Sequence, residues 1–392
     1  MNTDSRVQTI VRLLQDTLPD KPFIALHEPY FVGNEQAYVT ECITTGWVSS
    51  VGKFVDRFET MLQEYTGIAH AVATGNGTAA LHICLKLAGV ESGDEVLLPD
   101  LTFVATANAV TYCNAIPHFV DCEYKTLGLD PHKLRQYLAE IAEVKDGNCY
   151  NRITHRRIRA VVPMHTFGHP VDLDPLVEVC QQFQLQLVED AAESLGSYYQ
   201  GKHTGSFGLV AALSFNGNKV VTTGGGGAIL TNDAKLAQLA KHLTTTAKVP
   251  HRWEFYHDMI GYNYRLPNIN AALGCAQLEQ LPGFLNRKRA LALRYAQVFA
   301  KVSGVQFVTE PEFAHSNYWL NTLLLDEDMA SVRDALLETG NDQGIMLRPA
   351  WDLLHTLPMF KACPKMDLAA AEDLARRLVN IPSSASLGEV HG

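Results

Sequence analysis

Apolar residues in the first half of the chain follow two alternating patterns. Short apolar runs typical of buried strands cover residues 70–74, 95–99, 116–121, 159–164 and 185–189. Between these runs, apolar residues recur at the spacing of an amphipathic helix, as at Leu134, Leu138 and Ile141. Strands that alternate with helices predict βαβ units and a largely parallel sheet covered on both faces. We therefore expect an α/β fold.

The two ends of the chain predict additional parts. Residues 1–25 contain one short amphipathic stretch followed by Pro22, which indicates an N-terminal arm. Gly46 and Gly67 are expected to end two helices, and a long helix is expected from Pro267 to about residue 302, before a small α/β unit. Within that unit we expect a helix over 329–339, stopped by Gly340, and a strand over 345–347. We accordingly divide the chain into an arm (1–25), a large domain (26–265), and a long helix with a small C-terminal domain (266–392).

Composition limits the class of protein. Of the 392 residues, 47% are hydrophobic and 19% are charged, which is usual for a globular protein. The formal net charge of −10 argues against a nucleic-acid partner. The sequence contains no signal-peptide pattern and no apolar run long enough to span a membrane, so we expect a cytoplasmic protein without a membrane partner. Its eight cysteines form no C-x-x-C pair, and buried free thiols are expected.

Residues 144–157 are polar and basic, and they predict an inserted surface loop. Its cations are expected to form a solvated face, with nucleotide contact as the alternative. These cations, with the one that follows the loop, are Arg152, His155, Arg156, Arg157 and Arg159.

Lys219 lies in a segment, from Ser214 to Gly227, that combines a lysine with a run of glycines. It follows Ser214 by five residues and precedes four consecutive glycines, Gly224 to Gly227, between two apolar runs. Such glycines allow a backbone to pass close to a ligand. Lys219 is either a solvated loop lysine or a lysine that forms a Schiff base with pyridoxal phosphate (PLP).

The segment Gly75-Asn-Gly77-Thr78-Ala-Ala80 follows a strand and opens a helix. It matches a dinucleotide fingerprint, with Asp100 near the offset of the acidic residue. It equally suits a single phosphate, held by the amides of Gly77 and Thr78 at a helix N-terminus. A plain tight turn is the third interpretation.

Three further positions have a structural and a functional interpretation each. Phe103 either belongs to the core or stacks on a flat cofactor ring. Asp190 either caps a helix or pairs with the ring nitrogen of a pyridine cofactor. Asn263 either caps the following helix and faces solvent, or donates to a phosphate.

The combination and order of these segments resemble the DegT/DnrJ/EryC/StrS family of PLP-dependent sugar aminotransferases, which have the fold-type I aminotransferase fold. The resemblance covers the chain from about residue 25 onward. It rests on the following motifs: Gly75-Asn-Gly77-Thr78-Ala-Ala-Leu81, Pro99-x-x-Thr102-Phe103, Glu189-Asp190-Ala-Ala, Ser214-Phe215-x-x-x-Lys219, Gly224 to Gly227, and Gly261-Tyr262-Asn263-x-Arg265.

The resemblance implies a role for each matched residue. Lys219 would carry PLP and then act as general base, and Asp190 would pair with the pyridine nitrogen. Phe103 would stack on the ring. Gly77, Thr78 and Ser214 would hold the phosphate, while Asn263 would reach the phosphate of a neighbouring subunit in a homodimer. Glu193 departs from the family pattern, which has glutamine or histidine beside the 3′ oxygen of the cofactor in many members.

The implied reaction is transfer of an amino group from glutamate to a nucleotide-linked ketosugar, a step typical of polysaccharide biosynthesis. The motif Ser49-Ser-Val-Gly-Lys53, Leu98 to Phe103 and Glu193 resemble the C4 aminotransferases of the legionaminic-acid and bacillosamine pathways. We therefore expect a UDP-linked 2-acetamido-2,6-dideoxy-4-ketohexose as substrate. The alternatives are a dTDP- or GDP-linked 3-keto or 4-keto deoxysugar, a nicotinamide-dependent sugar oxidoreductase, and a non-catalytic regulator.

Overall fold

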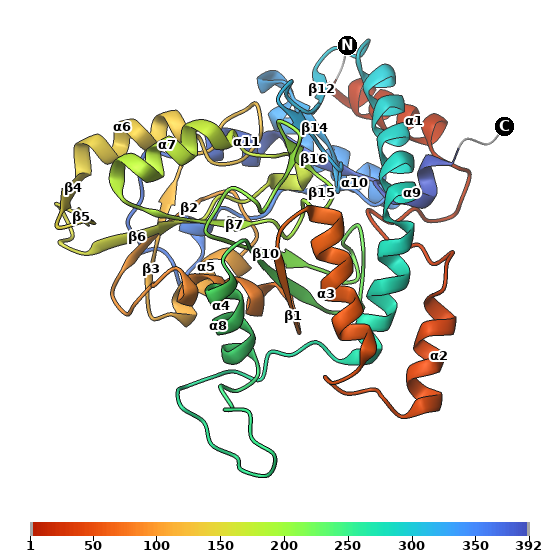
Figure 1. Cartoon of the computed structure of the whole chain (residues 1–392). Helices are drawn as coiled ribbons and strands as arrows, with labels where there is room; N and C mark the ends of the chain where they lie inside the picture. Colours follow the sequence, from red (N-terminus) through yellow and green to blue (C-terminus); the bar gives the residue numbers. More distant parts are fainter. Residues whose placement is uncertain (1–2, 390–392) are drawn as a thin grey trace.

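The computed structural model describes residues 3–389 and is built around one large sheet (Figure 1). Its main path has the order β1 (His70–Thr74), β11 (Gly227–Thr231), β10 (Val210–Ser214), β7 (Gln186–Asp190), β6 (Arg157–Val161), β2 (Glu95–Pro99) and β3 (Ile116–Val120). Neighbouring strands from β10 to β3 are parallel, whereas β11 is antiparallel to both β1 and β10. The predicted α/β fold with a largely parallel sheet is confirmed.

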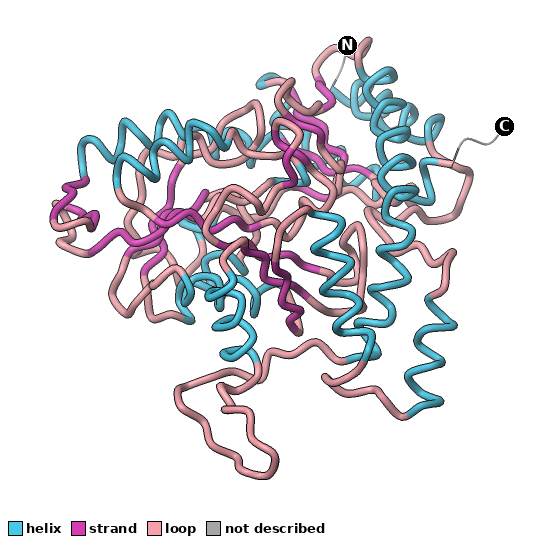
Figure 2. Tube along the Cα trace, viewed as in Figure 1, coloured by secondary structure: helices cyan, strands magenta, loops and turns pink. Residues whose placement is uncertain are grey.

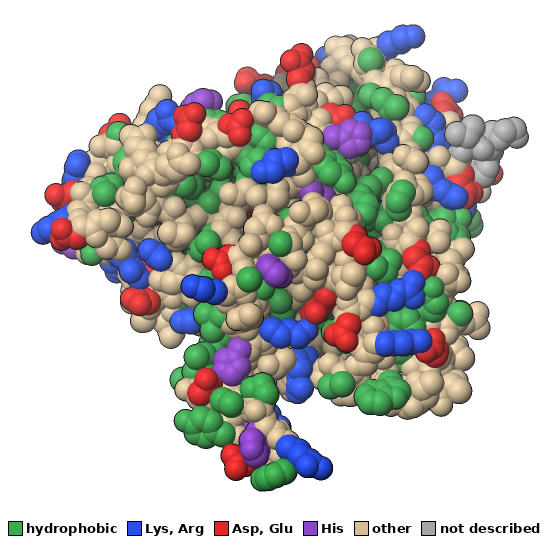
Figure 3. All heavy atoms as spheres, viewed as in Figure 1, with side chains coloured by type: hydrophobic (Ala, Val, Ile, Leu, Met, Phe, Trp, Pro, Cys, Tyr) green, Lys and Arg blue, Asp and Glu red, His purple; other side chains and the backbone are tan. Residues whose placement is uncertain are grey.

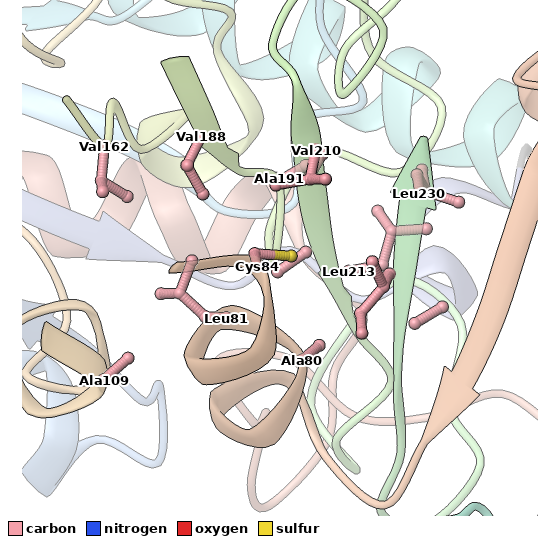
Figure 4. Close-up of a cluster of buried hydrophobic side chains, with 14 of the residues drawn as sticks. Ala80, Leu81, Cys84, Ala109, Val162, Val188, Ala191, Val210, Leu213 and Leu230 are labelled. Atoms are coloured by element: carbon pink, nitrogen blue, oxygen red, sulfur yellow. The ribbon is translucent and has the colours of Figure 1, made fainter. Parts of the chain in front are cut away.

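Helices cover both faces of this sheet (Figure 2). One face carries α4 (Gly77–Leu87), α5 (Ala105–Tyr112) and α8 (Ala234–Thr244), and the other carries α6 (Pro131–Ile141) and α7 (Leu173–Phe183). Figure 4 shows Leu81 and Cys84 of α4 in one buried apolar cluster with Val188 of β7 and Leu213 of β10. Strands buried between two helical layers explain why the sequence shows continuous apolar runs.

The inserted segment 144–157 is not the surface loop that we expected. Strands β4 (Ala142–Lys145) and β5 (Asn148–Asn151) form a hairpin, and β5 pairs with β6. The hairpin is fixed by the fully buried carboxylate of Glu95, which accepts hydrogen bonds from Asn151 Nδ2 at 2.9 Å and Thr154 Oγ1 at 2.5 Å. Buried polar groups are stable only when they are paired. Here Glu95 pairs with Asn151 and Thr154, which lie more than 50 residues away in the sequence. These strands therefore showed no apolar alternation from which they could be predicted.

Arg152, His155 and Arg156 are exposed, as expected for a solvated face, whereas Arg157 and Arg159 are only partly exposed. Arg157 pairs with Asp94 at 2.7 Å and Glu91 at 3.1 Å, and Arg159 Nε donates to the carbonyl of Ala88. They lie at the amino ends of the parallel strands, opposite the edge where ligands bind in such sheets. A nucleotide contact by these residues is therefore not supported.

The N-terminal and C-terminal segments pack together around the long helix α9 (Asn268–Phe299). Helix α1 (Thr3–Thr17) lies on α9 and on α10 (Arg333–Asp342), while α2 (Glu35–Thr45) and α3 (Lys53–Thr66) lie on α9. Gly46 and Gly67 end α2 and α3 in the left-handed conformation, as predicted. The division at residues 25 and 265 stays a prediction.

A smaller antiparallel sheet follows α9, in the order β12 (Val305–Phe307), β14 (Asn321–Leu325), β16 (Leu378–Ile381) and β15 (Arg348–Pro349). Strands β8 (Tyr198–Tyr199), β9 (Lys202–His203) and β13 (Ala314–His315) form a third sheet, and α11 (Ala369–Arg377) precedes β16. Our expectation that Gly340 stops a helix was wrong, because α10 continues to Asp342 and Gly340 faces Leu347 closely. The strand expected at 345–347 lies three residues later, at β15.

All eight cysteines are free, and seven of them are buried, as predicted. Across residues 3–389 no helix combines the length and the apolar character that crossing a membrane requires.

Candidate active site

The loop that carries Lys219 begins where β10 ends and returns to the sheet as β11. This loop and the start of α4 touch at two glycines, and neither position has room for a side chain. A Cβ on Gly227 would lie 2.6 Å from the carbonyl carbon of Asn76, and a Cβ on Gly77 would lie 2.7 Å from Cβ of Ser214. The loop and the start of α4 therefore fit against each other only because both positions are glycine.

The N-terminus of α4 presents free donors beside this loop. Asn76 caps the helix by accepting from the amide of Ala79, which leaves the amides of Gly77 and Thr78 without helical partners. Within the part of the chain that the structure describes, the hydroxyls of Thr78 and Ser214 make no hydrogen bond. The helix dipole adds positive potential at the same place. These groups form a site suited to a phosphate.

Asp190 ends β7 at the carboxyl edge of the sheet and is 6% exposed. Thr106 Oγ1 donates to its Oδ2 at 2.8 Å, and the amide of Ala192 donates to its Oδ1 at 3.2 Å. No helix follows it directly, so the helix-cap interpretation of Asp190 is wrong. Burial raises the pKa of Asp190 above its ordinary value, against the opposing effects of Thr106, the Ala192 amide and Lys219. A cation placed beside this carboxylate would be bound strongly, because it would relieve that burial cost.

Lys219 Nζ lies 3.2 Å from Oε1 of Glu193 and 3.8 Å from the centre of the Trp319 ring. The Lys219 side chain is 14% exposed and that of Glu193 is 3% exposed. Trp319 is held in place because its indole nitrogen donates to the carbonyl of Asn218 at 2.7 Å. The Lys219 amine is therefore largely shielded from solvent, and it contacts Glu193 and Trp319. Such an amine can react with a ligand in the cavity. The interpretation of Lys219 as a solvated loop lysine is therefore wrong.

These side chains line one cavity of about 290 Å³. The cavity brings together seven of the eight residues singled out from the sequence, namely Gly77, Thr78, Phe103, Asp190, Glu193, Ser214 and Lys219. Phe103, Asn218, Trp319 and Trp351 also line a neighbouring cavity of about 700 Å³. The small cavity therefore opens onto a larger space that can take a second molecule.

Sequence reasoning missed several residues of this cavity. Asn216 and Asn218 stand in the Lys219 loop, so their polarity beside the lysine was an available signal. Thr106 does not line the cavity but binds Asp190, and because it lies 84 residues away from that residue it had no such signal. Trp319 and Trp351 come from the last quarter of the chain, where no local motif marks them.

Asp100 has a structural role that excludes the dinucleotide interpretation. It is fully buried, and its carboxylate accepts from Nδ1 of His355 at 2.6 Å and from the His355 amide at 2.8 Å. The pair attaches the segment that carries Trp351 to the carboxyl edge of β2. Asp100 is fully buried and paired with His355, so it is not placed to bind a ribose. The segment from Gly75 to Ala80 therefore suits a single phosphate better than a dinucleotide.

Asn263 does not line the cavity of its own chain. It is exposed, and its Oδ1 accepts from Arg265 Nε at 3.2 Å. The segment just before it, residues 248–260, projects below α8 and carries Trp253, Phe255 and Ile260 with exposures of 68%, 80% and 84% (Figure 1). Apolar and histidine side chains gather on this projection (Figure 3).

The donor set of the small cavity fits PLP. A phosphate suits the N-terminus of α4 and the free hydroxyls of Thr78 and Ser214, and a protonated ring nitrogen suits the buried carboxylate of Asp190. Lys219 is a primary amine in the same cavity, which is the group that an aldehyde cofactor needs for covalent attachment. Phe103 and Trp351 supply flat apolar surface along the walls.

Comparison with known proteins adds independent information. A model of the DegT/DnrJ/EryC1/StrS aminotransferase family matches residues 29–391. The chain is similar to GDP-perosamine synthase of Caulobacter vibrioides, with 38% identity over 375 residues that cover 95% of this chain and 96% of that protein. It is also similar to GDP-perosamine synthase of Escherichia coli O157:H7, with 36% identity and coverage of 93% and 94%. Among solved structures, the aminotransferase TlmJ from Streptoalloteichus hindustanus superimposes with a TM-score of 0.83 and 30% identity, covering 93% of this chain and 94% of that chain.

Proposed function

Because this chain belongs to the DegT/DnrJ/EryC1/StrS aminotransferase family, whose members are PLP-dependent, we propose that it moves an amino group from glutamate to a nucleotide-linked ketosugar. The observation that carries the proposal is the meeting of Lys219, Asp190 and the phosphate donors in one cavity beside a space of about 700 Å³. Membership of this family removes the nicotinamide oxidoreductase hypothesis and the non-catalytic regulator hypothesis.

The residues of the cavity divide the work as follows. The cofactor, when bound, supplies the electron sink for charge that develops on the α-carbon of the amino donor. Gly77, Thr78 and Ser214 would hold its phosphate, and Asp190 would keep a proton on its ring nitrogen. Lys219 would attach it and would move a proton as general base. Trp319 and Trp351 line both cavities and supply apolar surface between them.

For the nucleotide, relatives favour an alternative over our first expectation. The two similar proteins described above are named for a GDP-linked sugar, at 38% and 36% identity, whereas nothing among them supports a UDP-linked substrate. We therefore propose a GDP-linked keto deoxysugar as substrate. The large cavity offers Arg348 for a phosphate and aromatic walls for a sugar ring.

A substrate panel tests this choice. With glutamate as donor, GDP-linked ketosugars should react about tenfold or more faster than UDP- or dTDP-linked ketosugars, because a pocket built to hydrogen-bond one base leaves polar groups unpaired with another. Formation of 2-oxoglutarate gives the rate, and NMR of the product gives the aminated carbon. A preference for the UDP-linked 2-acetamido sugar would restore our first expectation, and a preference for a dTDP-linked 3-ketosugar would contradict both.

We also propose that the enzyme is a homodimer in which Asn263 reaches the phosphate of the partner's cofactor. Its exposure, and its absence from the cavity of its own chain, support action between subunits. The apolar side chains on the projection at residues 248–260 need cover, which a second copy would give. The free thiols support a reducing compartment, and we propose the cytoplasm.

Mixing two inactive variants tests the shared site. Asn263→Asp places a negative charge against the phosphate, and Lys219→Ala removes the amine. In a mixed dimer one of the two sites regains both native residues, so a random equal mixture should recover about a quarter of wild-type activity. Activity that stays at the level of the separate variants, in dimers shown to be mixed, would place Asn263 in its own subunit's site.

A further inference from the structure

Glu193 is held so that one oxygen faces Lys219. Its Oε2 accepts from the backbone amide of Phe167 at 3.0 Å, and its own backbone carbonyl accepts from Asn317 Nδ2 at 2.8 Å. These bonds leave Oε1 directed at Lys219 Nζ, 3.2 Å away, in a part of the cavity where Glu193 is 4% exposed. Neither of the other two carboxylates of this strand end has that geometry: Asp190 is bound by Thr106 and Ala192, and Glu189 by His165 and three backbone amides.

The chemistry of Lys219 requires a nearby proton acceptor. An ammonium group has no lone pair, so Lys219 must lose a proton before it can bond to a carbonyl carbon or act as a base. The Trp319 ring at 3.8 Å attracts the charged form and so opposes this loss. Water has poor access to a side chain that is 14% exposed. The proton therefore needs a destination within the cavity.

We propose that Glu193 is a further catalytic residue, which takes a proton from Lys219 and returns it. An N–H bond of the ammonium breaks as an O–H bond forms at Oε1, so the ion pair becomes a neutral amine and a neutral carboxylic acid. The reverse transfer restores the ion pair. This inference rests on the proposed function of Lys219 and gives Glu193, which departs from the usual family pattern, a role of its own.

The electrostatics of the cavity support the transfer. Burial raises the pKa of Glu193 to about 7, with the negative charge of Asp190 acting in the same direction and Lys219 acting against it. These are the charged groups that face Glu193, from β7 and from the loop after β10. As the pKa of a carboxylate rises, it accepts a proton from an amine more easily. The reason is that the free energy of the neutral pair then lies closer to that of the ion pair. The carboxylate form predominates above pH 7 and is then ready to accept.

Uptake of PLP by the full-length chain, after removal of bound cofactor, measures this step without turnover. We expect wild-type covalent uptake, followed by absorbance, to rise through about pH 7 as Glu193 becomes a carboxylate. Glu193→Gln keeps the size of the side chain but cannot accept a proton, so uptake at pH 8 should slow by about tenfold or more and lose that rise. Glu193→Asp should keep the rise at a lower rate. The titrating groups of the added PLP are the same in all variants, so a difference between their pH profiles comes from the protein.

Glu189→Gln is the matched control, because Glu189 is a buried carboxylate four residues earlier, on β7, that binds His165 and no atom of Lys219. It should lower stability without changing the pH midpoint of uptake. Wild-type rate and pH profile in Glu193→Gln would overturn the proposal. If the loaded wild type forms no 2-oxoglutarate from glutamate, the aminotransferase proposal fails, and the uptake profile still decides the role of Glu193.

Discussion

Lys219→Ala is expected to abolish turnover, by about 10⁴-fold or more, while the protein still folds and binds PLP. Alanine removes both the amine that attaches the cofactor and the base that moves the proton. The phosphate donors at Gly77, Thr78 and Ser214 and the carboxylate of Asp190 stay in place, so the cofactor should remain bound without a covalent bond. Single-turnover absorbance with glutamate measures the loss of chemistry, and equilibrium dialysis of PLP measures the retained binding.

Borohydride reduction of the wild type should fix the cofactor on Lys219, and peptide mapping can identify the modified residue. Lys241→Ala is a suitable control, because that lysine pairs with Glu59 at 2.6 Å and lies outside the cavity. It should retain activity and the visible absorbance of the cofactor. A modified peptide that contains Lys202 or Lys241 instead of Lys219 would contradict the assignment.

Asp190→Asn is expected to reduce turnover by about 10²- to 10³-fold, the range seen when a fixed electrostatic partner is lost from an active site. Asparagine has the same size and can still accept from Thr106, so the fold should survive. It carries no charge to hold a proton on the ring nitrogen of the cofactor. The visible spectrum of the bound cofactor should change together with kcat, and both can be recorded on the same samples.

Asp121→Asn provides the comparison for a buried aspartate outside the site. Asp121 follows strand β3, two strands beyond β6 in the sheet, is 1% exposed, and binds Lys133 and the amides of Ala370 and Ala371. Its replacement should lower the thermal midpoint of unfolding while the cofactor spectrum stays unchanged. An Asp190→Asn enzyme with near wild-type kcat would remove Asp190 from the mechanism.

The sheet domain could be predicted from sequence because its elements are defined locally. Strands buried on both faces give continuous apolar runs, as at residues 95–99, and helices such as α6 repeat apolar residues at helical spacing. The hairpin of β4 and β5 lacks such a signal. It is held by the carboxylate of Glu95 from another strand, and an interaction between distant polar residues leaves no periodic trace in either segment.

The candidate site was predictable to the extent that its residues lie in short motifs at strand ends. Lys219, Asp190 and Gly77 each follow a recognisable apolar run, and parallel strands bring such positions to one edge. No local motif marks Trp319 and Trp351. Tertiary contacts bring them to the cavity, and for Trp351 one of these is the pair of Asp100 and His355. The orientation of Glu193 was also unpredictable, because the amide of Phe167 sets it.

The packing of α1 against α9 and α10 has a consequence for the order of events during synthesis. Helix α1 has both of its partners, α9 and α10, only after residue 342 has been added. At about 5 to 20 residues per second, this delay lasts tens of seconds. During that time the apolar face of α1 stays exposed to solvent and to chaperones.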